Sequence, residues 1–328
     1  MKYTIEKLTN IKDFLRQKIG ISAKMLSSLK KDEFGIMKNG ERATVRATLE
    51  CGDVLEINEF SCKKTPSRIE YLPDKKIAES AVSNIDIMSD KVNTKSPILP
   101  NIIYEDDYIL AINKPPHIPT HESHLHRGDA LSNSVTEYMK RKNPEYVFRA
   151  VNRLDKDTSG IVLTAKDRIS SYLMSKSIQN HEMKKTYIAV LRGCPDKMRG
   201  EIKTYIQRKG DSIIEREVCC QNENADLAIT RYRVVFSSNG LCVVLAYPIT
   251  GRTHQLRVHF SYIGHPIVGD TLYGDSDPRI SRQALHAMSL EFRHPQNREH
   301  LLLNAPPSED MITLLSGIGF DISKIQNK

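Results

Sequence analysis

Residues 151–160, VNRLDKDTSG, concentrate charged side chains directly before the apolar run IVLTAK. Asp155 lies between Arg153 and Lys156, and neighbouring cations favour an ionised carboxylate and lower its pKa. An ionised and positioned aspartate can act as a nucleophile or as a general base. These ten residues leave a structural alternative open, in which the carboxylate belongs to an ion-paired corner that carries no chemistry.

Three further chemical interpretations of this stretch are weaker. An aspartic protease would need Asp-Thr/Ser-Gly, whereas one more residue separates Asp157 from Gly160, and no second copy occurs. Ser159 lacks the G-x-S-x-G pattern of a serine hydrolase. Asp155 and Asp157 could also serve as paired carboxylates of a hydrolase, which would release a free base or sugar. Asp155 remains the main candidate.

Residues 184–193, KKTYIAVLRG, predict a strand with a tyrosine near its start. Alternation places Tyr187, Ala189 and Leu191 on one face of this strand. A tyrosine that packs in a core, with its hydroxyl hydrogen-bonded, would give the same pattern. The tyrosine alone is therefore a weak signal.

Residues 247–274, YPITGRTHQLRVHFSYIGHPIVGDTLYG, predict a turn and a helix with Thr253 as its N-cap. Leu256, Phe260 and Ile263 form one apolar helical face, which leaves Arg257 in the first turn free to reach sideways. A cluster of cationic and hydrogen-bonding side chains results: Arg252, His254, Arg257 and His259. A helix N-terminus beside it would favour an anion. The alternative is a solvated basic helix.

Histidines also gather in HIPTHESHLHRGD, at positions 117, 121, 124 and 126. Several imidazoles close together could bind zinc. Their spacing matches no metal motif, and a proline-bounded loop imposes no common face. We therefore predict no metal site.

The elements that must position these residues follow from periodicity. Residues 8–31 predict two short helices that break at Gly20, and residues 35–57 predict short strands with a hairpin turn at Asn39–Gly40. Residues 61–100 are rich in Lys, Ser, Asp and Asn without a sustained apolar period, which is typical of a linker, in part disordered. Further strands are predicted over residues 108–114, 159–166 and 241–247, the last one central in its sheet. We expect domains over residues 1–60 and 101–328.

Composition limits the class of protein. The 328 residues carry a net charge of +8 and a pI near 9.0, which favours a polyanionic partner such as nucleic acid. No apolar run approaches a membrane span, and the first residues contain no apolar core of a secretory signal. The six cysteines are scattered and include no C-x-x-C pair. We expect a cytoplasmic protein with reduced thiols and no membrane association.

Three stretches, in order, resemble the three signatures of the RluA/RluD-type pseudouridine synthases: NRLDKDTSGIVLTAK, KKTYIAVLRG and GRTHQLRVHFSYIGHPIVGDTLYG. Similar stretches also occur at 102–121, 225–234 and 285–295, so the resemblance covers most of residues 100–306. In front, IKDFLRQKIGISAKMLSSLKK…MKNG resembles an S4-like RNA-binding domain. The family commonly has histidine where Asn152 stands. We expect this departure to alter a supporting contact and to leave the chemistry intact.

This resemblance implies an α+β catalytic domain with a central mixed or antiparallel sheet flanked by helices, preceded by a small α+β S4-like domain. It implies an isomerase that needs no cofactor, because the base of a uridine is only detached, rotated and rejoined. By resemblance, Asp155 would meet C1′ of the sugar, Tyr187 would act as an acid or base and as a stacking surface, and Arg257 would pair with Asp155. With an ordinary pKa of about 10, Tyr187 would need local help to deprotonate near neutrality.

The resemblance also implies RNA as partner and a target uridine that leaves its helix. Arg153 would enter the vacated space, and further RNA contacts are expected from Arg252, His254, Lys12, Arg16, Lys24, Lys30 and Lys31. Large-subunit ribosomal RNA is the expected substrate, with tRNA as the alternative, and the protein is expected to be a monomer. A noncatalytic RNA-binding or ribosome-assembly factor on the same fold is the runner-up, which Asp155, Tyr187 and Arg257 together disfavour.

Overall fold

The computed structural model describes residues 1–58, 100–122, 128–210 and 212–326. These residues form two compact units, one within residues 1–18 and 22–58 and the other within residues 19–21 and 100–326. All but the last residue of the expected linker, 61–100, lies outside the described residues.

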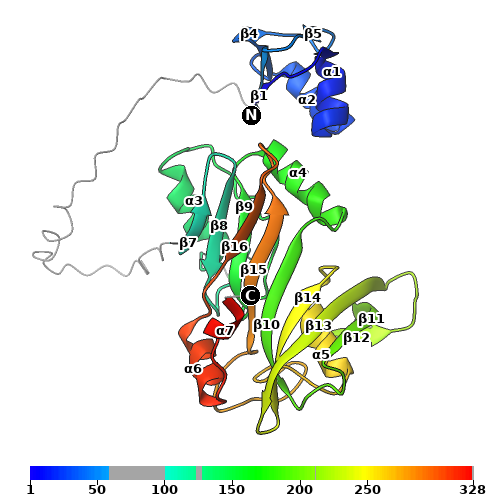
Figure 1. The fold of residues 1–328 in the computed structure, drawn as a ribbon, viewed down its shortest axis with the longest axis vertical. Coiled ribbons are helices and arrows are strands. Elements are labelled where there is room, and N and C mark those ends of the chain that lie inside the picture. Colours follow the sequence, from blue (N-terminus) through cyan, green and yellow to red (C-terminus); the bar gives the residue numbers. More distant parts are fainter. Residues whose placement is uncertain (59–99, 123–127, 211, 327–328) are drawn as a thin grey trace, which may run out of the picture. The chain divides into compact units, whose positions relative to one another are not determined.

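The N-terminal unit combines short helices with a four-stranded antiparallel sheet in the order β1-β6-β3-β4 (Figure 1). Its elements are β1 Lys2–Thr4, β2 Thr9–Asn10, α1 Ile11–Asp13, the π-helix η1 Phe14–Ile19, α2 Ala23–Lys31, β3 Ile36–Lys38, β4 Glu41–Arg42, β5 Thr48–Leu49 and β6 Val54–Ile57. Side-chain oxygens of Asn10 and Ser22 accept backbone hydrogen bonds at the starts of α1 and α2. Asn39 and Gly40 both adopt positive φ between β3 and β4, as the predicted hairpin turn requires.

The larger unit is built on a ten-stranded mixed sheet in the order β12-β11-β13-β14-β10-β15-β9-β8-β7, with β16 paired to β15 (Figure 1). Its strands are β7 Ile102–Glu105, β8 Ile109–Lys114, β9 Ser159–Ala165, β10 Lys184–Arg192, β11 Arg199–Arg208, β12 Arg216–Cys219, β13 Asp226–Ser238, β14 Leu241–Pro248, β15 Leu285–Arg293 and β16 His300–Asn304. Only β9 and β15 pair in parallel among the described strands. The predicted α+β class and the central place of β14 are confirmed.

Helices cover this sheet: α3 Leu131–Lys140, α4 Arg168–Gln179, α5 Gln255–Tyr262, α6 Glu309–Gly317 and α7 Ser323–Gln326. Leu256 and Phe260 of α5 are buried in one core with residues of β10, β14 and α6, and Ile263 packs against it. The apolar face predicted for this helix is thus confirmed. A second core joins α4 to β8 and β9, and a third places Leu154, from the loop before β9, beneath α3.

Gly160 makes the parallel pairing of β9 with β15 possible. Its φ is +114°, and a Cβ at this position would lie 2.2 Å from the carbonyl oxygen of Ala287 on β15. No side chain fits there. The close approach brings the loop before β9 to the centre of the sheet, where β10 begins.

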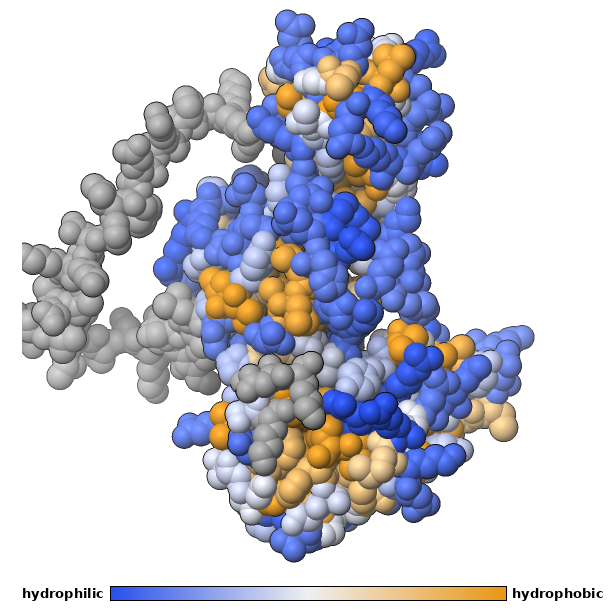
Figure 2. All heavy atoms as spheres, viewed as in Figure 1, coloured by the Kyte–Doolittle hydropathy of each residue, from blue (hydrophilic) through white to orange (hydrophobic). Residues whose placement is uncertain are grey.

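Hydrophilic residues cover most of the described surface in the view of Figure 2, and smaller hydrophobic patches interrupt them. Within the described ranges, no helix combines the length and the apolar character that crossing a membrane would require.

Candidate active site

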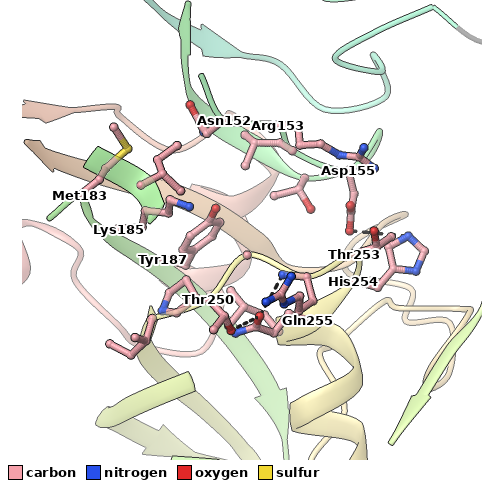
Figure 3. A pocket seen from close by; sticks show the side chains of 18 of the residues that line it. Asn152, Arg153, Asp155, Met183, Lys185, Tyr187, Thr250, Thr253, His254 and Gln255 are labelled. Carbon is pink, nitrogen blue, oxygen red and sulfur yellow. Dashed lines mark hydrogen bonds and ion pairs between the residues drawn. The ribbon is translucent and has the colours of Figure 1, made fainter. Parts of the chain in front are cut away.

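A cavity of about 580 Å³ in the larger unit is lined by segments far apart in the sequence. These include the loop before β9, the start of β10, and the turn between β14 and α5 (Figure 3). Asp155, Tyr187 and Arg257, the three residues singled out by sequence, all line this cavity. The fold therefore gathers them at one place.

Backbone anchors hold the loop that carries Asp155. The Thr120 hydroxyl donates to the carbonyl of Leu154 at 2.8 Å and accepts from the amide of Leu154 at 3.1 Å. The fully buried ammonium of Lys114 donates to the carbonyl of Lys156 at 2.9 Å and to two carbonyls of its own loop. Because both neighbours of Asp155 are fixed through their backbones, its carboxylate is confined to a narrow range of positions.

Asn152 ties the same loop to β9. Its side-chain amide donates to the carbonyl of Ile161 at 3.0 Å, and its side-chain oxygen accepts from the amide of Leu163 at 2.8 Å. Asn152, which stands where the family commonly has histidine, thus joins this loop to β9 through a supporting contact.

The guanidinium of Arg257 is buried and oriented by Asp270. Nε and one terminal nitrogen donate to the two carboxylate oxygens of Asp270 at 2.7 and 2.8 Å, which makes a bidentate pair. Burial opposes the charge of Arg257, but the bond to Asp270 and the nearby carboxylates outweigh it and raise the pKa of Arg257. The helical pattern predicted an Arg257 that is free to reach sideways. In the structure, Asp270, a carboxylate outside the helix, holds its guanidinium in place.

The partners of Asp155 are a guanidinium and an imidazole from the region of α5. The second terminal nitrogen of Arg257 lies 3.5 Å from Oδ2 of Asp155, and Nε2 of His254 lies 3.9 Å from the same oxygen. Arg153 and Lys156 are exposed, and no ion pair joins either of them to Asp155 in the part of the chain that is described. The expected support from these sequence neighbours is therefore replaced by support from residues about one hundred positions away.

Tyr187 projects from β10 into the cavity that Asp155 also lines (Figure 3). Burial and the negative charge of Asp155 raise the pKa of Tyr187 well above its ordinary value. The surroundings thus favour the protonated phenol and give no help to its deprotonation.

The start of α5 differs from the prediction. Thr253 does not cap the helix; the residue at the N-cap is His254, whose φ is +56° and whose side chain caps nothing. Instead, Oε1 of Gln255 accepts from the amide of Arg252 at 3.0 Å and from the Thr250 hydroxyl at 2.6 Å. A side chain inside the first turn therefore fixes the loop, and the left-handed His254 turns its ring toward Tyr273 and Asp155.

The remaining residues expected to bind RNA occupy two places. Arg153 and Arg252 are exposed and line the cavity, and Arg252 pairs with Asp226 at 3.2 Å. The five cations predicted to bind RNA in the N-terminal unit are all exposed: Lys12, Arg16, Lys24, Lys30 and Lys31. His259, counted in the cationic cluster, is instead fully buried between Thr204 and Thr230, and burial lowers its pKa to about 4.

The histidine-rich loop forms other contacts. His117 pairs with Asp157 at 2.9 Å, and His121 packs edge-on against Phe148. Positions 124 and 126 lie outside the described residues. Among the residues that are described, no group of three or more metal-binding side chains occurs.

Sequence reasoning missed Asp270, Tyr273 and Lys114. The first two stand in the third signature stretch, GDTLYG, but no periodicity indicates that this loop folds back on α5. Lys114 ends the predicted strand before Pro115, where a lysine suggests an exposed strand end. Only the tertiary structure shows its burial.

Comparison with known proteins identifies the family. Residues 108–262 match the family model described as RNA pseudouridylate synthase. A Bacillus subtilis protein named "Uncharacterized RNA pseudouridine synthase YjbO" is 34% identical over 299 residues, which cover 91% of this chain and 96% of that relative. The "Ribosomal large subunit pseudouridine synthase C" of Pasteurella multocida is 34% identical over 239 residues, 70% of this chain and 72% of that relative.

A solved structure supports the same family assignment. "Human RNA Pseudouridylate Synthase Domain Containing 1" matches with a TM-score of 0.53 and 28% identity, over 66% of this chain and 86% of that one. The chain therefore belongs to the RluA/RluD-type family of RNA pseudouridine synthases, which are isomerases.

Proposed function

We propose that this protein converts uridines of large-subunit ribosomal RNA to pseudouridine, with Asp155 as the catalytic carboxylate. The observation that carries the proposal is the convergence of Asp155, Tyr187 and Arg257 in one cavity. The substrate class is supported by relatives that are named ribosomal large subunit pseudouridine synthases.

The reaction breaks the N1–C1′ bond of a uridine and joins C1′ to C5, while C5 loses a proton and N1 gains one. Positive charge develops at C1′ as the base departs, and a carboxylate beside C1′ stabilises it. Asp155 suits this role, because its side chain is one-quarter exposed at the cavity and its position is set by a guanidinium. Arg257 orients that carboxylate through a contact of 3.5 Å, while Asp270 balances the charge of Arg257.

Tyr187 is proposed to hold the base. Its raised pKa keeps the phenol protonated at neutral pH, so it offers an aromatic face and a hydroxyl donor. We therefore propose stacking and hydrogen bonding for Tyr187 in place of proton abstraction. Arg153 and Arg252, exposed at the cavity, are proposed to contact the surrounding RNA.

The N-terminal unit is proposed to be an S4-like module that binds RNA phosphates through exposed cations that include Lys12, Arg16, Lys24, Lys30 and Lys31. Each phosphate contact adds to the salt dependence of affinity.

Replacing Lys24 and Lys30 together with glutamine should weaken RNA binding and make it less sensitive to salt. Lys203→Gln, an exposed change on β11 of the larger unit, serves as the control and should do neither. Equal salt slopes for all three proteins would contradict this role.

The proposed substrate is tested by mapping pseudouridines chemically in total RNA from cells with and without the gene. We expect specific positions of large-subunit ribosomal RNA to revert to uridine when the gene is absent. Loss confined to tRNA would contradict the proposed substrate while leaving the reaction intact. An unchanged map in cells that produce the protein would instead favour the noncatalytic RNA-binding factor.

A further inference from the structure

We propose that Tyr273 and His254 are positioning residues for Asp155: the Tyr273 hydroxyl holds His254 in the tautomer whose Nε2–H is directed at the Asp155 carboxylate. The inference rests on the proposed role of Asp155 and extends it to Tyr273 and to His254, for which the sequence predicted an RNA contact. Its evidence is a chain of contacts that begins at the backbone of β12 and ends at the cavity.

The contacts determine where the protons lie. The Tyr273 oxygen accepts from the backbone N–H of Arg216 at 2.8 Å, and it lies 2.8 Å from Nδ1 of His254. Among the described residues, Nδ1 is the acceptor within hydrogen-bond distance of that hydroxyl. Since a half-buried hydroxyl proton left undonated is costly, it is donated to Nδ1, and the neutral imidazole carries its own proton on Nε2.

Electrostatics support the neutral ring. Burial lowers the pKa of His254 despite the nearby carboxylates of Asp155 and Asp270. Burial also raises the pKa of Tyr273, so its hydroxyl keeps the proton that it donates. The two groups therefore remain a neutral donor and acceptor pair at neutral pH.

The position of His254 allows the Tyr273–His254 pair to orient Asp155. Nε2 of His254 lies 3.9 Å from Oδ2 of Asp155, the oxygen that also lies 3.5 Å from Arg257. Contacts of this kind are often long without substrate and shorten once it binds. A donor at Nε2 steers one carboxylate oxygen, whereas the other tautomer would present a lone pair to a negative charge.

Tyr273 supports the second partner of Asp155 as well. Its ring lies 5.0 Å from the guanidinium carbon of Arg257, and its amide donates to Asp270 at 3.3 Å. The ring can therefore be kept while the hydroxyl alone is removed, which makes Tyr273→Phe the informative change. Tyr262→Phe, at an exposed tyrosine on α5, is the matched control.

The test combines a spectrum with kinetics. Long-range ¹H–¹⁵N correlation on histidine-labelled protein, with His254→Asn to assign the signal, should show wild-type His254 protonated on Nε2. Tyr273→Phe should convert it to a mixture of tautomers and lower kcat about tenfold with KM for RNA unchanged, because one hydrogen bond is lost. Tyr262→Phe should change neither.

Two results would overturn the inference: wild-type His254 protonated on Nδ1, or a Tyr273→Phe enzyme with wild-type kcat. The spectrum of the wild-type protein needs no turnover, and it needs only His254→Asn, used to assign the signal, to fold. A failure of the catalytic assignment is detected separately, as full turnover by an Asp155 variant, and leaves the tautomer result standing.

Discussion

At the scale of single residues, the site depends on how buried charges are balanced. Arg257 shares its guanidinium between a fully buried Asp270 and the partly exposed Asp155. The pair with Asp270 fixes the donor, and the weaker contact leaves Asp155 able to meet a substrate. One carboxylate therefore acts as structural support and the other faces the cavity.

Asp270→Asn tests whether Asp270 balances the buried charge of Arg257. Removing one partner of a buried ion pair leaves an uncompensated charge, so we expect the free energy of unfolding to fall by about 3 kcal/mol. The exposed Asp275→Asn, five residues on, should change it by less than about 0.5 kcal/mol. Urea unfolding of the three proteins measures both effects. Equal stabilities would mean that Asp270 does not balance Arg257.

At the scale of elements, periodicity predicted the strands that carry the site. The strand at Lys184–Arg192, the strand after the Asp155 loop and the helix from Gln255 are all present. The start of that helix could not be predicted, because Gln255 fixes the loop through contacts with Thr230 and Ile229, residues of another strand. The Arg257–Asp270 pair escaped prediction for the same reason: sequence spacing does not show which loop folds back on a helix.

Gly160→Ala tests the close contact between β9 and β15. A Cβ would meet the Ala287 carbonyl at 2.2 Å, and backbone cannot move aside as a flexible side chain does. We expect a loss of more than about 3 kcal/mol in the free energy of unfolding. Gly240 also has positive φ, but a Cβ there would meet no atom of the described residues within 4 Å. Gly240→Ala therefore isolates the backbone strain and should cost about 1 kcal/mol. Similar losses for both variants would contradict the packing argument.

At the scale of the whole molecule, buried neutral histidines couple stability to pH. His286 is fully buried, accepts from Ser159 at Nδ1 (2.9 Å) and donates to the carbonyl of Ala305 from Nε2 (3.1 Å). Burial lowers its pKa to about 4. Because the unfolded chain binds the proton more readily, the contribution of His286 is complete above about pH 6.5 and is lost as the pH falls towards 4.

The His286→Gln variant checks this sign. Between pH 7 and pH 4, the free energy of unfolding of the wild type should fall by about 3 kcal/mol more than that of the variant, which cannot titrate at this position. Chemical unfolding at several pH values measures the difference. Parallel curves would show that His286 does not drive acid destabilisation.

For the whole molecule, composition predicted the class of partner but not the contacts within the site. The excess of positive charge indicated a polyanionic partner, and membership of the pseudouridine synthase family identifies RNA as that partner. The ordered signature stretches predicted the fold and the residues that line the cavity. Which of them face one another, and which hidden residues hold them, depends on contacts between elements that no single stretch contains.

If the Asp155 carboxylate performs the chemistry, Asp155→Asn should lose single-turnover formation of pseudouridine. Asp157→Asn, in the same loop and paired with His117, is the matched control. We expect Asp155→Asn to bind RNA with nearly wild-type affinity while its turnover falls by roughly a thousandfold or more, and Asp157→Asn to stay active. Wild-type turnover by Asp155→Asn would contradict this role of Asp155.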